Sequence, residues 1–415
     1  MIREILVYLS AFIGLFAVSY YTLSLIALRK YDKVRDFTFK ELPTVSIMLP
    51  TYNKAKTIER TIQTALNLDY PKEKLEVIFV DNNSSDGGYE IAKAIKDKRV
   101  RVYREKQQGK GYAMNLALSK AKGEIVVSMD ADTYAEPDSL RKMLNYFTNP
   151  DVMCVTPSMA IYEPKGFWKR IQQAEYLMGV FLRKAFSTMN AMHVTPGAFS
   201  AYRKVFFEKH GGYEGGNLTE DMEVALRIQY LGYSIKCADD AVVFTECPKT
   251  FKQLFYQRRR WYFGWIHNLL KYKKLFSKDY GHMGAIVLPV AVTTIMLSIV
   301  LTIFIVYQLI TSLKHELLLL GNTELSFSGV FDISWFAIEK FFYLFFSKPT
   351  SVILVVFLSI VIGYMVFAKR RVKKHANVVV GMLLFVLLYS ILLTFWWLVA
   401  AFYYFIIGKT VWGKS

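Results

Sequence analysis

The sequence predicts an α/β domain with a largely parallel sheet, attached to about four membrane-spanning helices. Between Val45 and about Thr245, short β-rich runs (VSIMLP, LEVIFVD, EIVVSMD and VMCVTP) alternate with amphipathic helical stretches such as Ala55–Leu68. This alternation is typical of parallel strands joined by crossover helices. Long apolar runs lie outside that region, and the hydrophobic content is 53% of the 415 residues. This value is high for a soluble protein and indicates that part of the chain lies in lipid.

The chain is strongly basic, with a formal net charge of +18 at pH 7. Such a balance is typical of proteins that bind nucleic acid, an anionic membrane surface or a phosphate-bearing substrate. The arginines at 258–260 are interleaved with aromatic residues and no nucleic-acid recognition motif is present, so we expect no nucleic-acid partner. Cys154, Cys237 and Cys247 have neither metal-ligand nor redox spacing, which suits a reducing compartment and argues against a disulfide framework.

The first apolar run, Ile5 to Leu28, is long enough to cross the hydrocarbon core of a bilayer. A cleaved signal peptide is the competing interpretation. The length of the run and the lack of a small-residue cleavage site after it favour an anchor over residues 1–30. Arg29 and Lys30 follow the run, and basic residues at that end place the next domain in the cytoplasm.

Three later apolar runs read as further spans within residues 284–415, namely Ala285–Ile310, Ser351–Ala368 and Asn377 to about Ile407. Basic residues at 271–278 and at 369–374 flank these spans and predict the same cytoplasmic side. The run from Ile333 to Phe346 is too short for a span and predicts an interfacial or re-entrant helix. We therefore expect an integral protein of the cell membrane whose α/β domain, residues 43–250, is cytoplasmic.

A basic amphipathic helix is predicted at about residues 168–186. Apolar side chains line one face, and most of the basic side chains lie elsewhere. Such a helix can lie in the membrane surface. A helix that packs on the core of the α/β domain is the alternative.

A second interfacial helix is predicted over residues 251–276, where FYQRRRWYFGW places consecutive arginines among aromatic rings. If Phe251 to Lys271 is helical, Gln257, Arg260 and Trp261 share one face, and Gly264 continues that face and leaves room for a ligand. Arg259 then points roughly opposite and Arg258 to the flank, where they can meet lipid phosphates or carboxylates of the domain. The rings are of the kind that settle at the boundary between water and lipid.

Acidic residues stand at or just after predicted strand ends, where open α/β sheets bind their ligands. Asp81 ends one strand, and Asp130 and Asp132 follow another. In an extended segment this spacing puts both carboxylates on one side, so they can share Mg²⁺ or Mn²⁺ that also binds a diphosphate. Glu220 and Asp221 open a predicted helix. Taken singly, each acid could be a turn former or a helix cap.

The order of these motifs resembles that of the membrane-integrated, inverting family 2 glycosyltransferases with a GT-A fold, the group that contains cellulose, chitin and hyaluronan synthases. That family has an Asp, an Asp-x-Asp, a Thr-Glu-Asp and a Gln-x-x-Arg-Trp motif in this order. In this sequence they stand as Asp81, Asp130-Ala131-Asp132, Thr219-Glu220-Asp221 and Gln257-Arg258-Arg259-Arg260-Trp261. The resemblance covers roughly Pro43 to Leu270 and implies a GT-A (Rossmann-like) domain that transfers a sugar from a nucleoside-diphosphate sugar.

The resemblance also implies residue roles on the donor side, with a UDP-sugar as the expected donor. The nucleobase and ribose would be held by Pro50, Thr51, Tyr52 and Asp81. Lys110 and Arg260 would lie at the diphosphate. Asp132 would bind Mg²⁺ or Mn²⁺, and Asp130 would support the metal or the donor ribose.

On the acceptor side, the resemblance implies that Asp221 is the general base, within the catalytic motif that also holds Thr219 and Glu220. An inverting transfer needs only one such base. Trp261 would stack on the acceptor sugar beside Gln257. The loop before a predicted strand would approach the acceptor through Gly197, Ala198 and Phe199.

Two features depart from the family pattern: Asn82 replaces the usual second acid of the first motif, and the spans are few. A growing polysaccharide as acceptor is favoured by the Gln-x-x-Arg-Trp motif and the amphipathic helices. A lipid or lipid-linked glycan is favoured by the few spans. A non-catalytic scaffold or transporter is the remote alternative, although every acid needed for turnover is present and charged residues are scarce within the spans.

Overall fold

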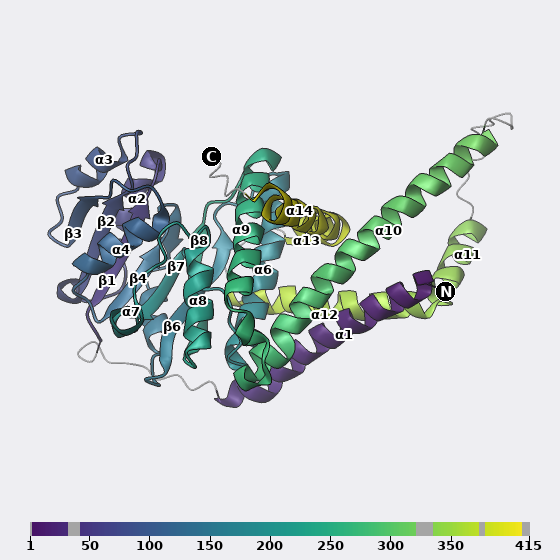
Figure 1. Ribbon diagram of the computed structural model, residues 1–415, viewed down its shortest axis with the longest axis horizontal. Helices are drawn as coiled ribbons and strands as arrows, with labels where there is room; N and C mark the ends of the chain where they lie inside the picture. The colour runs from purple at the N-terminus through teal and green to yellow at the C-terminus, as the bar shows by residue number, and fades with distance from the viewer. Residues whose placement is uncertain (1, 32–41, 321–334, 373–377, 409–415) are drawn as a thin grey trace.

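The computed structural model describes residues 2–31, 42–320, 335–372 and 378–408. An eight-stranded mixed sheet in the order β3-β2-β1-β4-β7-β6-β8-β5 forms the centre of the α/β domain (Figure 1). Its strands are β1 Val45–Thr51, β2 Leu75–Asp81, β3 Val100–Arg104, β4 Ile125–Met129, β5 Thr133–Ala135, β6 Val152–Ile161, β7 Phe199–Arg203 and β8 Ser234–Thr245.

The first half of the sheet is parallel, as the sequence predicts. Strands β3, β2, β1 and β4 run in the same direction, and Thr51 pairs in register with Asp81, so the carboxyl ends of β1 and β2 meet at one edge. The second half is mixed, because β7 runs antiparallel to both β4 and β6. This antiparallel strand starts at the edge where β4 ends, and Met129 pairs with Phe199.

Helices cover both faces of the sheet because side chains alternate along its buried strands. In β1, Ile47 and Leu49 join a core under α2, whereas Met48 joins a second core under α4, α7 and α8. The helices of the domain are α2 Ala55–Leu66, α3 Gly88–Ala94, α4 Lys110–Lys120, α5 Ser139–Leu144, α7 Lys204–His210 and α8 Glu220–Tyr230, with a 3-10 turn η2 at Lys72–Lys74.

Two long helices, α6 Phe167–Thr188 and α9 Phe251–Lys271, lie between the sheet and the apolar helices (Figure 1). Helix α6 packs on β6 and β8 with one side and on α12 and α13 with the other. Its basic side chains lie in different surroundings, and Arg170 is exposed. Lys169 and Lys184 are buried and pair with Glu246 and Asp239, because the helix is covered on both sides.

The apolar helices are α1 Ile2–Leu28, α10 Leu288–Leu320, α11 Trp335–Phe346, α12 Pro349–Arg371, α13 Val378–Leu384 and α14 Ser390–Phe402. Short 3-10 or π-helical turns adjoin them at Arg29–Tyr31, Lys273–Phe276, Lys278–Tyr280, Met283–Val287, Phe385–Tyr389 and Tyr403–Ile407.

Three stretches in the described part of the chain are long and apolar enough to cross a membrane: Glu4–Leu28, Met283–Lys314 and Pro349–Arg371. A fourth candidate, Val379–Tyr389 with Ile391–Ile407, is bent by 49° and is either a broken span or a re-entrant loop. The sequence prediction of about four spans thus becomes three or four. Asn377, Ile333 and the basic residues 373 and 374 lie outside the described residues.

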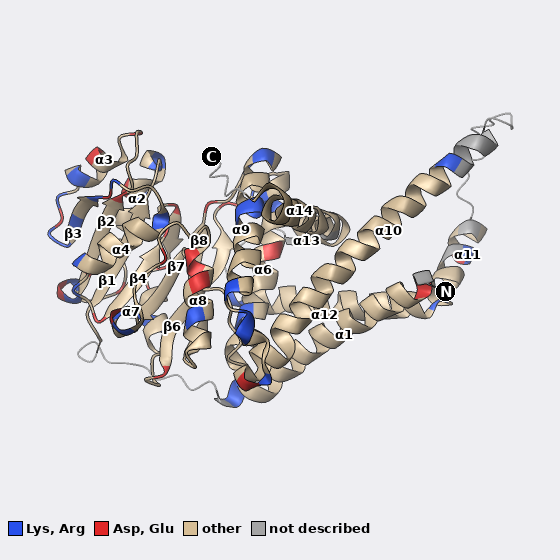
Figure 2. Cartoon of the chain, viewed as in Figure 1, with Lys and Arg blue, Asp and Glu red and all other residues tan. Residues whose placement is uncertain are grey.

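The long apolar helices extend away from the sheet and carry their charges mainly near their ends (Figure 2). Near the domain they meet in one cluster, which includes Tyr21 and Leu25 of α1, Phe181 of α6, Leu288 of α10 and Tyr364 of α12. The basic residues that follow α1 and close α12 therefore lie on the side of the α/β domain.

Candidate active site

A charged cluster lies at the carboxyl edge of β4, where the chain leaves the strand. Lys110, the first residue of α4, places its Nζ 2.7 Å from Asp130 Oδ1 and 2.8 Å from Glu220 Oε1. Lys54, just before α2, places its Nζ 3.0 Å from Asp132 Oδ2. Asp130 and Lys110 remain 35% and 28% exposed, so the cluster opens to solvent. Four segments that are distant in sequence therefore bring their charges to one place.

The charged groups in this cluster shift one another's pKa values. Burial alone would lower the pKa of Lys110, but the carboxylates of Asp130 and Glu220 outweigh it and raise that pKa. Burial would raise the pKa of Asp130, and Lys110 instead holds it below its usual value. At Asp132 the balance is reversed, because burial raises the pKa more than Lys54 lowers it. Asp132 therefore keeps a raised pKa although Lys54 pairs with it.

This pair of aspartates fits an oxygen-ligated divalent cation. Both carboxylates lie at the end of β4, and both side chains reach solvent. Among the residues described, no group of three or more His, Cys, Asp or Glu side chains is placed to hold a metal ion. Mg²⁺ typically uses one or two carboxylates together with substrate phosphates and water. Asp130 and Asp132 would therefore need the diphosphate to complete the site.

Asp221 lies in the first turn of α8, beside the same cluster. Its Oδ1 accepts from the amide of Met222 at 2.8 Å, and its Oδ2 accepts from the amide of Gly197 at 3.3 Å. Burial raises the pKa of Asp221 to about 6; the neighbouring Glu220 adds to the rise and Lys110 opposes it. A carboxylate with this pKa is ionised at neutral pH and is still basic enough to take a proton.

The loop before β7 separates Asp221 from Asp130. A Cβ on Gly197 would lie 2.4 Å from Lys110 Nζ, so only glycine lets the ammonium group approach this backbone. Ser128 Oγ donates to the carbonyl of Gly197 at 3.0 Å and fixes the loop to β4. Of the loop residues predicted to approach the acceptor, Gly197 borders the charged cluster.

Ala198 and Phe199 correct that prediction. The Phe199 side chain is fully buried in the core of the domain, and Ala198 is 3% exposed. The reason is the pairing of β7 with β4, which begins at Phe199 and turns its ring under the sheet. Neither side chain can touch an acceptor from its place in this structure.

At the ends of β1 and β2, the predicted donor-binding residues differ in access. Pro50 and Thr51 are buried, whereas Tyr52 is 48% exposed. Asp81 is fully buried, and its Oδ2 accepts from Arg104 Nε at 3.0 Å. A nucleotide sugar that contacts this carboxylate would have to share it with Arg104. The sequence motifs did not indicate Arg104.

Asn82 has a role that its motif did not predict. Its Nδ2 donates to the carbonyl of Gln107 at 2.6 Å, and its Oδ1 accepts from the amide of Gly109 at 2.7 Å. These bonds hold the loop that leads directly into Lys110. An aspartate could accept from Gly109 but could not donate to Gln107. The departure from the family pattern therefore matches a local need for a carboxamide.

The three consecutive arginines of α9 lie in different surroundings. Arg258 is buried, pairs with Glu175 Oε2 at 2.6 Å, and lies over the ring of Trp261 at 4.3 Å. Arg259 is buried among rings, with Tyr403 at 4.7 Å. Arg260 is exposed, and its charge contributes to the lowered pKa of Asp130.

The Gln-x-x-Arg-Trp face is thus only partly open. Arg258 covers one face of the Trp261 ring, so an acceptor sugar would have to stack on the other. Gln257 Oε1 is buried and has no hydrogen-bond partner within the described chain. Gly264 corrects a prediction: a Cβ there would lie 2.2 Å from Thr219 Oγ1, so the space beside it is filled by Thr219 and leaves no room for a ligand.

Motif reading missed Lys54, Arg104 and Asn268. Lys54 follows a strand end by three residues, in the same PTYNKA stretch as Thr51, and that position was a usable signal. Arg104 ends β3, next to β2 in the sheet, but only the sheet order reveals it. Asn268 is fully buried on α9 and contacts Thr219, and nothing in the local sequence marks it.

The chain is similar to known proteins in sequence and in fold. The family model "Glycosyl transferase family 2" matches residues 46–211. The probable glycosyltransferase YdaM of Bacillus subtilis (strain 168) is 30% identical over 267 residues, 60% of this chain and 61% of the relative. The poly-beta-1,6-N-acetyl-D-glucosamine synthase of Staphylococcus aureus (strain COL) is 29% identical over 245 residues, 58% of this chain and 59% of the relative. The matched part is therefore about three fifths of the length of these relatives.

One solved structure resembles most of the chain. The mannosyltransferase PcManGT from Pyrobaculum calidifontis, solved in complex with GDP-Man and Mn²⁺, has a TM-score of 0.52 and 20% sequence identity. The match covers 92% of this chain and 99% of that one and shows the shared fold. Residues 46–211 thus match a family 2 glycosyl transferase domain, within an α/β domain of the GT-A fold, in a chain that also carries helices apolar enough to cross a membrane.

Proposed function

We propose that this protein is a membrane-bound, inverting glycosyltransferase that transfers a sugar from a nucleoside-diphosphate sugar to a growing polysaccharide. One observation carries the proposal. Asp130 and Asp132 at the end of β4, Lys110 at the start of α4 and Asp221 at the start of α8 form one charged cluster that is open to solvent. Such a cluster combines a site for a diphosphate with a base.

In the proposed reaction, Asp221 takes the proton from an acceptor hydroxyl. The acceptor oxygen forms a bond to the anomeric carbon while the bond from that carbon to the diphosphate oxygen breaks, and the configuration inverts. The nucleoside diphosphate leaves with the electron pair of the broken bond. The raised pKa of Asp221, about 6, suits this role at neutral pH.

The leaving diphosphate gains negative charge during the transfer, and positive groups near it lower the barrier. Lys110 and Arg260 are the cationic side chains that we assign to this task. Asp130 and Asp132 would hold Mg²⁺ or Mn²⁺, which when bound would supply a further positive charge to the diphosphate oxygens. Before the nucleotide sugar binds, Lys110 is paired with Asp130 and Glu220.

We also propose that the catalytic domain is cytoplasmic and that the protein is integral to the cell membrane. The ends of α1, α10 and α12 that meet beside the domain are those with adjacent basic residues. Basic residues favour the cytoplasmic side of a span. A cytoplasmic site also has access to nucleotide sugars, with a UDP-sugar as the proposed donor.

Two classes of acceptor are candidates, a polysaccharide and a lipid or lipid-linked glycan. A polysaccharide is supported by the relatives named as poly-beta-1,6-N-acetyl-D-glucosamine synthases and by Trp261, which is partly exposed and has Arg258 over one face of its ring. A lipid or lipid-linked glycan is supported by the small number of candidate spans, three or four, which offers little helix to enclose a channel.

The test is release of nucleoside diphosphate by detergent-purified protein. Wild type and Asp221→Asn would be incubated with a panel of UDP-, GDP- and dTDP-sugars, led by the N-acetylglucosamine donor, with Mg²⁺ or Mn²⁺. We expect release from one donor by the wild type and its loss in Asp221→Asn. Equal release by both proteins would exclude Asp221 as the base, and full activity of the variant in transfer would revive the non-catalytic scaffold.

Membranes incubated with the labelled donor would then decide between the acceptors. A ladder of products supports the polysaccharide synthase, whereas addition of one sugar to a chloroform-soluble acceptor supports the lipid alternative. The anomeric configuration of the product, read by NMR, tests inversion independently of product length.

A further inference from the structure

Helix α9 makes a close contact with the Thr-Glu-Asp motif. Gly264 faces Thr219, and a Cβ on Gly264 would lie 2.2 Å from Oγ1, 2.6 Å from Cγ2 and 2.9 Å from Cβ of that threonine. Because the Cβ of Thr219 would itself lie only 2.9 Å from the added Cβ, rotation of the threonine side chain would not relieve the clash. The Thr219 side chain therefore packs directly on the backbone of α9 at Gly264.

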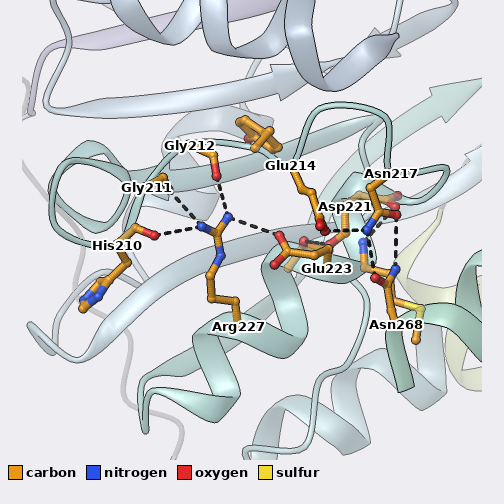
Figure 3. A network of polar contacts seen from close by, with 12 residues as sticks. His210, Gly211, Gly212, Glu214, Asn217, Asp221, Glu223, Arg227 and Asn268 are labelled. Carbon is orange, nitrogen blue, oxygen red and sulfur yellow. Dashed lines mark hydrogen bonds and ion pairs between the residues drawn. The ribbon is translucent and has the colours of Figure 1, made fainter. Parts of the chain in front are cut away.

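One turn further along the same face of α9, Asn268 binds the same threonine. Its Nδ2 donates to Thr219 Oγ1 at 2.9 Å and to the Thr219 carbonyl at 3.3 Å. Its Oδ1 accepts from Asn217 Nδ2 at 2.9 Å, and Asn217 Oδ1 in turn accepts from the amide of Thr219 at 3.0 Å. Figure 3 shows Asn268 and Asn217 facing each other, close to Asp221.

This arrangement replaces an ordinary helix cap. A threonine at the N-cap usually accepts from an amide of the first helical turn. Thr219 is the N-cap of α8, but its side chain makes no such bond and is bound by Asn268 instead. The Thr219 hydroxyl is hydrogen-bonded to α9 and not to the first turn of its own helix. The position of the start of α8 therefore depends on α9.

A second α8–α9 contact offers a comparison. Tyr272, just after α9, donates to Glu223 Oε1 at 2.6 Å, and Lys271 Nζ lies 2.8 Å from Glu214 Oε2. Glu223 is two residues beyond Asp221 and therefore points to a different side of α8. Arg227 binds Glu223 and the carbonyls of residues 210–212, as Figure 3 shows. The bond from Tyr272 to Glu223 does not involve Thr219, whereas Glu214 also accepts from Asn217 Nδ2 at 2.9 Å, so Tyr272 is the residue that serves as the comparison.

We propose that Asn268 is a positioning residue for the candidate base Asp221, acting through Thr219. The residues at 257, 261, 264 and 268 form one stripe along α9. The helix that presents Trp261 therefore also holds the helix start that presents Asp221, and Asn268 keeps the two at a constant separation. This inference rests on the proposed function, because positioning matters only if Asp221 takes a proton.

The first experiment compares Asn268→Ala with Tyr272→Phe, each of which removes hydrogen bonds between α8 and α9. We expect Asn268→Ala to lower kcat by about 100-fold with little change in the KM of the donor, because a displacement of about 1 Å can cost that much. Tyr272→Phe should keep kcat near the wild-type value. If both variants lose activity equally, or if neither does, Asn268 only helps to dock the helix and the inference is wrong.

Thr219→Val supplies a second test if Asn268→Ala folds poorly, because it removes the hydroxyl and keeps the branched shape that packs on Gly264. We expect a similar loss of kcat, and the double variant should lose little more than either single one, since both break the same bond. Independent, multiplied losses would overturn the inference.

Asn268→Asp adds a readout that docking alone would not change. Aspartate keeps the acceptor for Asn217 but cannot donate to Thr219, and it adds negative charge near Asp221. We expect the acid limb of the pH profile to move to higher pH, whereas Asn268→Ala should leave its position unchanged. An unmoved limb in Asn268→Asp would contradict this geometry.

Hydrogen exchange of the peptide that covers residues 217–223 separates failure of this inference from failure of the proposed function. Exchange there should be faster in Asn268→Ala than in Tyr272→Phe whether or not a donor is turned over. If the wild type transfers no sugar from any donor, the proposed function fails and the catalytic meaning of Asn268 fails with it. If transfer occurs and exchange is equal in the two variants, only the inference fails.

Discussion

The rate of transfer should depend on pH below neutrality, because the candidate base is a carboxylate held in a crowded, partly buried site. Burial raises the pKa of Asp221 to about 6, and the neighbouring Glu220 adds to the rise. A general base must be ionised to accept a proton, so activity should be present above this pKa and lost as the pH falls through it.

The magnitude follows from the ionised fraction. With a pKa of about 6, Asp221 is about nine-tenths ionised at pH 7 and about one-tenth ionised at pH 5. The value of kcat/KM should therefore fall by about tenfold between these two pH values. An aspartate with an ordinary pKa, about 3.9, would show almost no change over the same range.

Two variants make the prediction directional. Lys110 lowers the pKa of Asp221 and Glu220 raises it. Lys110→Met should therefore move the acid limb to higher pH, and Glu220→Gln should move it to lower pH, although both lower the maximum rate. Initial rates of nucleoside-diphosphate release, measured from pH 5 to pH 8 at low donor concentration, give kcat/KM for each protein. A flat profile in the wild type, or shifts of the same sign in the two variants, would refute the assignment of Asp221.

Three further predictions concern other contacts. Asn82→Asp, which restores the usual residue of the family, should raise the donor KM by about tenfold because the Gln107 carbonyl loses its donor; an unchanged KM would contradict this. Glu175→Gln should lower the free energy of unfolding by about 1–3 kcal/mol, because the buried Arg258 loses its counter-charge. The measurement is the thermal midpoint in detergent, and Arg258→Met, which keeps the carboxylate, is the comparison. Chelation should abolish transfer, with Mn²⁺ or Mg²⁺ restoring it, and Asp132→Asn should raise the metal concentration required; activity that survives chelation would exclude the metal.

The parts of the fold that local sequence patterns determine were predictable. Apolar runs predicted strands β1, β2, β4 and β6, and the helix predicted over residues 251–276 corresponds to α9, Phe251–Lys271, followed by a 3-10 turn at Lys273–Phe276. The antiparallel insertion of β7 between β4 and β6 depends on pairing between distant segments. That pairing buries Phe199, which explains why its predicted contact with the acceptor was wrong.

The candidate site was also predictable where it depends on local sequence and not where it depends on contacts between distant segments. Acids at the ends of parallel strands meet at one edge of the sheet, so Asp81, Asp130 and Asp132 could be placed from the sequence. Their cationic partners come from other segments: Lys54 is 78 residues from Asp132, and the pair forms only when α2 lies beside β4. No spacing rule predicts a pair at that separation.

The basic run in α9 shows how a packed helix distributes charges that look alike in sequence. Successive residues of a helix point about 100° apart, so three consecutive arginines must face three directions. Arg258 faces α6, where Glu175 neutralises it; Arg259 lies among rings; and Arg260 remains exposed near the carboxylates at the sheet edge. Only the last of these is available to a diphosphate. The other two hold α9 against its neighbours, and they thereby keep Trp261 and Asn268 at constant positions relative to the sheet. A net charge of +18 therefore says little about this site, because two of the three consecutive arginines of α9 are buried and used for packing.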